Sequence, residues 1–364
     1  MKGGAPVLWC LVAAALFGAS TPASKVLLDG MGPLTLAGLL YLGAALATAP
    51  FSLKGGSAER RRDPANLRRL GGAVLFGGVL GPVALLWGLR LAPAASVSLW
   101  INLESVATAV LAWMFFKEHV DRRTAVASLA VVAAGIWLSA PEGFRFAPAA
   151  LLVLGAATCW GLDNNLTSMI DGYTPAQSTF VKGLVAGAVN LVLGISLEGE
   201  LPGLSVVGGA LLLGALAYGA SIVLYIAGAQ QLGATRSQMI FASAPFVGVA
   251  LSWLVLGEPV LAAQIGAAVL MIGALALMLS AKHGHSHEAL RHTHPHRHDD
   301  GHHDHTHPGL PADAWHTHEH GHEAVVHTPP PTRPSPSARA LSRTRAASPT
   351  WRSPPPRDHR DGPG

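Results

Sequence analysis

Apolar stretches of membrane-spanning length recur along the first 281 residues and are separated by short polar loops. A helix needs about 20 apolar residues to cross the hydrocarbon core of a bilayer. Ten stretches approach this length, and they begin near Val7, Pro33, Leu70, Ala94, Ala125, Ala149, Gln177, Leu204, Gln238 and Leu261. The pattern predicts an all-α membrane protein with ten transmembrane helices. An even number of spans places both ends of this region on one side of the membrane.

The chain changes character near Ala281. Only 13% of its 364 residues are charged, against about 25% in soluble domains, and the low figure comes from the apolar region before this point. Of the 18 His residues, 17 follow it, in a segment with almost no aliphatic run. A segment of this composition has too little apolar surface to form a core, so we expect a disordered tail after the last helix.

The distribution of Lys and Arg over the loops predicts the orientation, because basic residues are retained on the cytoplasmic side. With the N-terminus inside, the inner side holds the twelve residues Lys2, Lys54, Arg60, Arg61, Arg62, Arg68, Arg69, Lys117, Arg122, Arg123, Arg236 and Lys282. The outer side holds only Lys25, Arg90 and Arg145. We therefore expect a multi-pass protein of the cytoplasmic (inner) membrane with both termini, and hence the tail, in the cytoplasm.

The membrane region contains an internal repeat with an offset of about 140 residues. The matching segments are Phe17–Gly18 with Trp160–Gly161, Asp29–Pro33 with Asp171–Pro175, Leu91–Ala94 with Leu232–Thr235, and Phe116–Val120 with Leu256–Val260. Each half holds five spans, and an odd number makes the second copy enter the membrane from the opposite side. Such inverted repeats are common in secondary transporters, where two halves alternate access to a midplane site.

We accordingly expect four parts in the chain. They are a first five-helix repeat over residues 1–140, a second five-helix repeat over 141–281, a His-rich tail of metal-binding type over 282–328, and a Pro/Ser/Arg-rich disordered tail over 329–364.

Two five-span halves, each with an aromatic-Gly pair in the first helix and a Glu just past the fourth, resemble the drug/metabolite transporter superfamily and specifically its EamA-type members. The segments that carry the resemblance are Leu16–Lys25, Gly88–Val120, Leu154–Leu166 and Gln231–Val260. The resemblance implies a secondary carrier of small organic molecules, often an exporter of amino acids or other metabolites.

The resemblance also implies motif residues. Glu118 and Glu258 match the Glu positions after the fourth helix of each half, where a structural role as a cap or an ion-pair partner is expected. A Pro that is usual in the family matches Pro245 in the second half, whereas Ser105 stands at that position in the first half.

Three ionisable residues fall inside predicted spans: Glu104, Asp163 and Lys182. Such residues are costly in a bilayer and usually face an interior cavity. Asp163 and Lys182 are expected ~5 Å from the midplane on consecutive helices, at 1.5 Å per residue, and could pair. One interpretation is a purely structural ion pair. The other is a substrate cavity, in which Lys182 meets a carboxylate and an acid meets an amine or carries a coupling proton, with Glu104 favoured for the proton.

The candidate substrate site adds polar and aromatic neighbours of these three residues. They are Trp100, Asn102, Asn164, Asn165 and Asn190. Successive positions of a helix point about 100° apart and cannot all serve one packing contact, so the run from Asp163 to Asn165 favours a cavity for a zwitterionic or polar solute.

The tail has many His residues at alternate positions. The candidate ligands for a labile metal ion are His283, His285, His287, His292, His294, His296, His298, His302, His303, His305, His307, His316, His318, His320 and His322. Residues i and i+2 of an extended chain share a face, and nitrogen ligands suit Ni, Co, Zn or Cu. We expect a flexible metal buffer without a fixed site.

The motifs of ATP-driven pumps and of common enzymes are missing from the sequence. It contains no P-loop, no Gly-x-Ser-x-Gly, no His-Glu-x-x-His and no dinucleotide fingerprint. Cys10 and Cys159 lie in apolar runs and indicate neither a disulfide nor a thiolate site. We therefore expect a protein that is not an enzyme, that requires no cofactor and that takes its energy from a gradient.

The leading hypothesis is a secondary transporter that exports an amino acid or a related solute, driven by a proton gradient or by exchange. The main alternative is a divalent-metal exporter whose tail collects Ni, Co or Zn. A further one is a non-transporting anchor or sensor for a metal-binding tail. The expected partners are the lipid bilayer, a small-molecule solute and metal ions at the tail, with no nucleic acid. The protein is expected to be a monomer or a homodimer.

Overall fold

The structure is a computed structural model of the chain. It describes residues 4–53, 63–116, 122–139, 147–170, 172–199, 201–232, 237, 240–279 and, in the tail, 285–286, 290–296, 316–322 and 326–327. The chain divides into two compact units, Met1–Ala281 and Lys282–Gly364.

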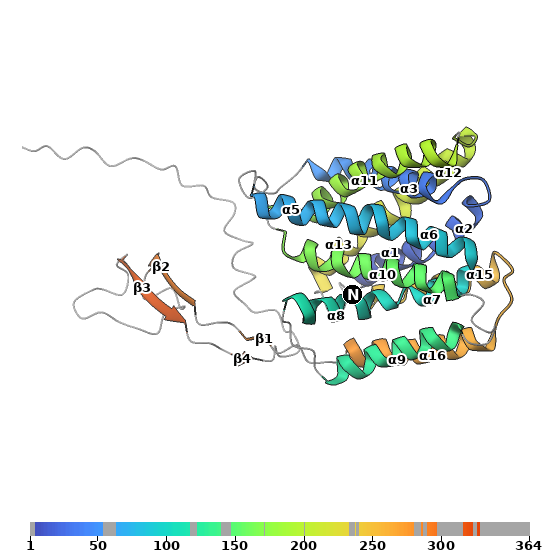
Figure 1. Cartoon of the computed structure of the whole chain (residues 1–364). Helices are drawn as coiled ribbons and strands as arrows, with labels where there is room; N and C mark the ends of the chain where they lie inside the picture. The colour runs from blue at the N-terminus through green and yellow to red at the C-terminus, as the bar shows by residue number, and fades with distance from the viewer. Residues whose placement is uncertain are drawn as a thin grey trace, which may run out of the picture. The chain divides into compact units, whose positions relative to one another are not determined.

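The first half of the membrane unit forms five helical rods, three of which are built from consecutive pieces (Figure 1). They are α1 (Gly4–Gly18) with α2 (Ser20–Leu27); α3 (Pro33–Ser52); α5 (Pro64–Ala73) with the π-helix η1 (Val74–Leu80) and α6 (Gly81–Leu91); α7 (Ala94–Trp100) with α8 (Leu103–Phe116); and α9 (Arg122–Ser139).

The second half repeats this order. Its rods are α10 (Ala147–Ser168); α11 (Pro175–Glu198); α12 (Leu204–Gly214) with the π-helix η2 (Ala215–Ala220) and α13 (Ser221–Leu232); α15 (Ala244–Leu254); and α16 (Ala262–Leu279).

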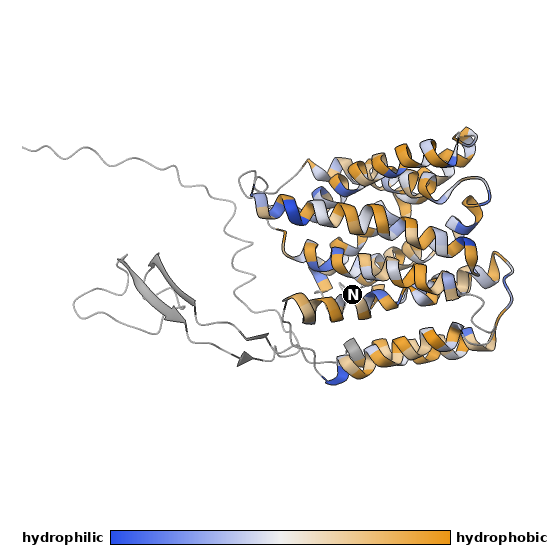
Figure 2. Cartoon of the chain, in the orientation of Figure 1, coloured by the Kyte–Doolittle hydropathy of each residue, from blue (hydrophilic) through white to orange (hydrophobic). Residues whose placement is uncertain are grey.

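The prediction of an all-α membrane protein with ten helices in two inverted repeats is confirmed. In the described residues, six helices are long and apolar enough to span a bilayer: Gly4–Leu27, Pro33–Ser52, Pro64–Leu91, Ala94–Phe115, Pro175–Glu198 and Leu204–Ala229. Hydrophobic residues cover most of each helix, and hydrophilic ones lie mainly near the ends, as at the starts of α5 and α9 (Figure 2). Large apolar side chains such as Leu129, Leu151 and Val192 are exposed, as expected for a surface that faces lipid.

The repeat extends to irregularities of the backbone. Both π-helices lie in the third rod of their half, seven residues at Val74–Leu80 and six at Ala215–Ala220. The fourth rods are also interrupted in both halves, at Asn102 between α7 and α8 and at Ser243 before α15. These irregularities recur at matching places in both halves and are therefore part of the repeated fold.

The two halves interdigitate. The first rod of the first half packs against α13 and α15, while α10 of the second half packs against α6 and α8. The helices α9 and α16 lie side by side (Figure 1). Helices of one half therefore lie between helices of the other, and a cavity among them is lined by residues of both halves.

Close approach of α3 and α11 depends on glycine. A Cβ at Gly38 would meet the backbone of Leu191, and a Cβ at Gly183 would meet the backbone of Tyr41. The contacts run in opposite directions along the two helices, which are therefore antiparallel. Small residues that let backbones approach are the usual basis of helix packing in membranes.

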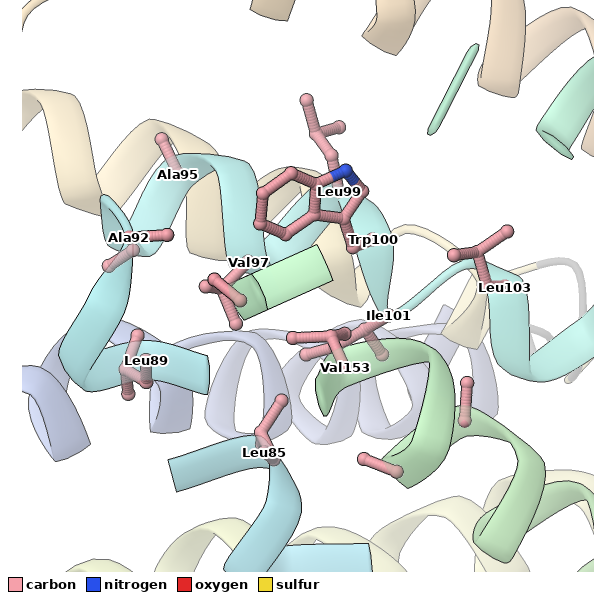
Figure 3. Packing of buried hydrophobic residues seen from close by; sticks show 14 of the residues in the cluster. Leu85, Leu89, Ala92, Ala95, Val97, Leu99, Trp100, Ile101, Leu103 and Val153 are labelled. Atoms are coloured by element: carbon pink, nitrogen blue, oxygen red, sulfur yellow. The ribbon is translucent and has the colours of Figure 1, made fainter. Parts of the chain in front are cut away.

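A core of large apolar side chains surrounds the break in the fourth rod. Trp100 is 1% exposed and lies among the side chains labelled in Figure 3, and its indole Nε1 donates to the Gly135 carbonyl at 3.2 Å. The indole thus joins α7 to α9 and fixes the end of α7 immediately before the break.

Part of the tail forms short antiparallel strand pairs, which the sequence analysis does not anticipate. β1 (His285–Ser286) pairs with β4 (Val326–His327), and β2 (Leu290–His296) pairs with β3 (His316–His322). Backbone hydrogen bonds join the strands of each pair. A two-stranded ladder is marginally stable at best in water, so these pairs do not give the tail a core of its own.

The close packing of α3 on α11 predicts that alanine in place of Gly38 lowers the stability of the protein, whereas alanine in place of Gly155 does not. In Gly38→Ala the new Cβ would lie 2.5 Å from the Leu191 nitrogen, which belongs to the backbone and cannot move aside. We expect a lower thermal midpoint of the detergent-purified protein, measured by fluorescence-detected size exclusion. Gly155→Ala is the control, because its Cβ meets nothing within 4 Å. The intrinsic preference of helices for Ala, about 0.8–1.0 kcal/mol, should keep or raise its midpoint, and equal effects of the two changes would contradict the packing argument.

Candidate functional site

A cavity of about 210 Å³ lies among helices of both halves. It is lined by Phe17, Tyr41, Ala44, Glu104, Trp160, Asp163, Asn164, Thr179, Lys182, Gly183, Tyr218 and Ile222. These residues come from α1, α3, α8, α10, α11, η2 and α13. Most of them lie near the middle of their rods, where an inverted repeat is expected to place a substrate site.

Lys182 and Asp163 form an ion pair across α11 and α10. The Lys182 Nζ donates to Asp163 Oδ1 at 2.7 Å and to Oδ2 at 2.6 Å, and the side chains are 18% and 10% exposed. Thr167 Oγ1 donates to Oδ1 at 3.0 Å. Gly77 of η1 faces Asp163 so closely that a Cβ there would overlap the carboxylate. The pair is therefore held on several sides, and Lys182 is not free for a second carboxylate unless the pair opens.

Glu104 is the third ionisable residue of the cavity and lies in the first turn of α8, just after the helix break. Its Oε1 accepts from Asn164 Nδ2 at 2.9 Å, and the same amide reaches Thr108 Oγ1 at 3.3 Å. In the part of the chain that the structure describes, no hydrogen bond reaches Oε2 and no cation pairs directly with Glu104. Asp163 and Lys182 lie within electrostatic range of it.

Four aromatic rings form another part of the wall. The Phe17 and Tyr218 rings pack edge to face with centroids 5.7 Å apart, and the Tyr41 and Tyr218 rings are stacked at 5.9 Å. The Tyr41 hydroxyl and Trp160 Nε1 both donate to the carbonyl of Gly77. A π-helix alters the regular helical hydrogen bonding and is frequent at functional sites, and here two ring donors of the cavity wall converge on one of its carbonyls.

Tyr41 and Tyr218 are not among the site residues predicted from the sequence, and Phe17 enters that prediction only as part of the repeat. The usable signal was that Phe17 and Trp160 occupy aligned positions in the two halves, and both line the cavity. Tyr41 and Tyr218 carried a weaker signal, as hydroxyl-bearing rings in the middle of apolar spans.

Four of the eight candidate substrate residues line the cavity, namely Glu104, Asp163, Asn164 and Lys182. The other four make contacts between helices. Trp100 bonds to α9 as described above, and Asn102 Nδ2 donates to the Leu99 carbonyl at 3.0 Å beside Met271. Asn165 Nδ2 donates to the Thr108 carbonyl at 3.1 Å, joining α10 to α8.

Asn190 is fully buried and braces the π-helix of the third rod. Its Nδ2 donates to the Gly78 carbonyl at 3.0 Å, while its Oδ1 has no hydrogen-bond partner within the described ranges. The contact lies behind the ion pair, since Gly77 and Gly78 face Asp163 and Lys182 respectively. Asn190 thus supports the wall of the site without lining it.

Two glutamates cap helices of the opposite half. Glu258 accepts from the backbone nitrogens of Ala94 and Ala95, at 2.6 and 2.9 Å, at the start of α7. Glu198 accepts from those of Leu34 and Thr35, both at 2.9 Å, at the start of α3. A carboxylate satisfies the unpaired N–H groups of a helix start and complements its dipole. Glu118, the counterpart of Glu258, lies outside the described residues.

Two cations cap helix ends at the same end of the bundle. Lys25 Nζ donates to the carbonyls of Leu89 and Ala92, near the end of α6. Arg90 Nη2 donates to those of Leu28 and Met31, after α2, at 3.4 and 3.1 Å. With Glu198 and Glu258, four charged side chains tie this end of the bundle together. Asp163 and Lys182 lie toward the opposite end, where α10 ends and α11 begins.

Pro245 lies in the first turn of α15, after the break at Ser243. At this break the Phe246 nitrogen donates to the Ser243 carbonyl. At the break of the first half, the Ser105 nitrogen donates to the Asn102 carbonyl in the same way. The residue that corresponds to Pro245 by this geometry is Glu104, one position before the Ser105 expected from the sequence. The first half therefore has a carboxylate where the second half has a proline.

The metal candidates belong to the tail unit. His283, His287, His298, His302, His303, His305 and His307 lie outside the described residues. The backbone register of β2 and β3 places His292 opposite His320, His294 opposite His318, and His296 opposite His316. A metal-sized group of three or more His, Cys, Asp or Glu side chains is not found among the described residues.

Two interdigitating five-helix halves around a polar cavity define a membrane transporter of small solutes. The chain belongs to the EamA-like transporter family, whose model matches it twice, at residues 4–140 and 147–280. The resemblance found in the sequence is thereby confirmed.

The chain is also similar to individual proteins. An "uncharacterized transporter" of Methanothermobacter thermautotrophicus is 24% identical over 298 residues, which cover 75% of this chain and 85% of the relative. A solved crystal structure matches with a TM-score of 0.55 and 18% identity over 76% of this chain and 96% of its own. The structural likeness supports the fold alone.

The ion pair makes a prediction about stability. Asp163→Asn leaves the Lys182 ammonium without its counter-charge, and breaking a buried pair typically costs about 3–5 kcal/mol. We expect a clearly lower thermal midpoint for this variant in detergent. The double variant Asp163→Asn/Lys182→Met removes both charges and should regain much of the loss. A double variant as unstable as the single one would show that the charge pair is not the source of the effect.

Proposed function

We propose that the protein is a secondary active exporter of a small organic metabolite, an amino acid or a related solute, in the cytoplasmic membrane. Both termini lie in the cytoplasm, in keeping with the excess of Lys and Arg in the loops of that side. The observation that carries the proposal is the cavity between the two halves, which holds Glu104, Asp163 and Lys182. Buried ionisable groups in a membrane protein usually mark the path of a substrate or a proton.

The size of the cavity supports a small cargo. Its volume of about 210 Å³ is below the ~300–1,000 Å³ of sites for drug-sized ligands. Aromatic and charged groups share its wall, so the cargo combines an apolar body with at least one polar group. The protein moves this cargo without converting it chemically.

Alternating access follows from the inverted halves. The four charged caps of Lys25, Arg90, Glu198 and Glu258 close the end that this orientation makes external, and Asp163 and Lys182 lie toward the cytoplasmic end. Rocking of one half against the other would have to release the caps of Glu198 and Glu258, which join the two halves, and close the opposite end. Energy comes from a proton gradient or from exchange, with Glu104 as the group that carries the proton.

The alternative cargo is a divalent metal ion, Ni, Co or Zn, collected by the tail. The His-rich composition of residues 282–328 and the His pairs in register on β2 and β3 favour this alternative. The cavity favours the organic cargo, because Asp163 is already paired with Lys182 and a divalent cation prefers several free ligands. In our proposal the tail is an accessory buffer for labile Ni, Co, Zn or Cu, and the membrane unit works as two repeats, residues 1–140 and 141–281.

A survival assay distinguishes these two cargoes. Cells that express the full chain are compared with cells that express residues 1–282, on toxic amino-acid analogues and on Ni, Co and Zn salts. We expect resistance to one or more analogues that is unaffected by the truncation. Metal resistance that disappears with the tail would replace our proposal with the metal exporter.

A second prediction concerns the coupling proton. Glu104→Gln keeps the hydrogen-bonding shape of the side chain but can carry neither the charge nor the proton, so we expect loss of proton-driven flux at least tenfold, with normal amounts of folded protein in membranes. Flux is measured in proteoliposomes with an imposed pH gradient. Asp29→Asn changes an exposed carboxylate after α2 and should transport normally. Normal proton-driven flux in Glu104→Gln would remove this residue from the coupling.

A further inference from the structure

We infer that the cargo is a small organic cation, whose ammonium group binds at Glu104 in place of the coupling proton. This inference rests on the proposed export function and specifies its substrate class. The charges of the cavity, the partners of each charged group and the aromatic wall carry it.

The charged groups that line the cavity do not balance. The ionisable groups that line the cavity, apart from tyrosine, are two acids and one base: Glu104, Asp163 and Lys182. The ammonium of Lys182 contacts both oxygens of Asp163, so these two charges compensate each other. Glu104 remains, and its partner in the described residues is the neutral amide of Asn164. An uncompensated carboxylate in a low-dielectric site is costly, so Glu104 needs either a proton or a bound cation.

The cavity is poorly suited to an anionic cargo. A cargo carboxylate would need a cation, and Lys182 is the only Lys or Arg that lines the described cavity. Lys182 could accept the carboxylate only by leaving Asp163, which would leave a second uncompensated acid beside Glu104. The cavity therefore selects against anions, and it binds a zwitterion less well than the corresponding amine.

The aromatic wall of the cavity indicates which kind of cation it binds. The rings of Phe17, Tyr41, Trp160 and Tyr218 line the same cavity as Glu104. Aromatic faces attract ammonium groups within about 6 Å of the ring centroid and also cover apolar groups. A metal ion requires several oxygen or nitrogen ligands, which aromatic faces do not supply. An acid with aromatic walls thus fits an alkylammonium group attached to a small apolar body.

Competition between the ammonium and a proton at Glu104 couples export to the proton gradient. A monovalent ammonium and a proton each neutralise Glu104, so the two exclude each other while the net charge of the cavity stays the same. Outward movement with the ammonium and return with a proton form a one-for-one exchange. A proton gradient directed inward would then drive export, without net transfer of charge for a monovalent cargo.

The experiment uses the purified full chain and two series of probes with the same apolar body. One series is isobutylamine, valine and N-acetylvaline, and the other is 3-methylbutylamine, leucine and N-acetylleucine, so that each contains a cation, a zwitterion and an anion. Proton release on binding is followed with a pH dye in weakly buffered detergent solution. We expect binding to weaken from the amine to the amino acid to the N-acetyl compound, with protons released by the amines. Over the range in which Glu104 is protonated, the apparent Kd of an amine should rise about tenfold for each unit by which the pH is lowered.

Variants separate the role of Glu104 from a structural one. Glu104→Gln should abolish both the proton release and the preference for the amine, and Glu104→Asp should retain the pH dependence with an altered midpoint. Asp29→Asn is the matched control for loss of a carboxylate and should behave as the wild type.

Two results would overturn the inference. Tighter binding of N-acetyl compounds than of amines would do so and would leave the proposed export of small metabolites standing. Failure of the folded wild-type protein to bind any of the six compounds would also reject this substrate class, and the survival assay would then decide separately whether the export function stands.

Discussion

The ion pair between Lys182 and Asp163 requires that α10, α11 and the π-helix η1 meet within a few ångströms inside the membrane. In hydrocarbon neither charge is tolerated alone, so the pair holds these three elements together. Glycine makes the approach possible, since Gly77 and Gly78 present bare backbone to Asp163 and Lys182. Asn190 then supports the same stretch from behind through the Gly78 carbonyl. The position of the cavity follows from these contacts.

A second constraint acts at the ends of the helices. Helix termini leave backbone groups without partners, and near a bilayer the protein must supply many of those partners itself. At one end of the bundle, charged side chains do this across the two halves, with Glu258 on α7 and Glu198 on α3. Each cap makes the stability of a helix in one half depend on a residue of the other. Relative movement of the halves therefore has a specific cost, and it is concentrated at that end.

Much of this architecture could be predicted from the sequence, because hydropathy fixes the spans and the repeat fixes their relative direction. The buried acids and the lysine were also predictable, since charge inside a span is rare. The positions of Asn102, Asn165 and Asn190 were not, because periodicity does not tell which face of an all-apolar helix meets a cavity. The same ambiguity hid Tyr41 and Tyr218. The sequence alone leaves the residue aligned with Pro245 ambiguous by one position, because the offset between the halves is 141 at Leu91–Ala94 and 140 at Phe116–Val120.

The repeated scaffold carries a site that is not repeated. By the hydrogen bonds of the helix break Glu104 corresponds to Pro245, and by the sequence repeat Asp163 corresponds to Ser20 and Lys182 to Leu40. The π-helices, the helix breaks and the aromatic pair of Phe17 and Trp160 are common to both halves, whereas each of these three charges occurs in one half alone. An inverted scaffold by itself provides two related conformations that open to opposite sides. A single set of charges in the shared cavity lets the same groups meet both compartments in turn, which a duplicated set, with its doubled desolvation cost, would not improve.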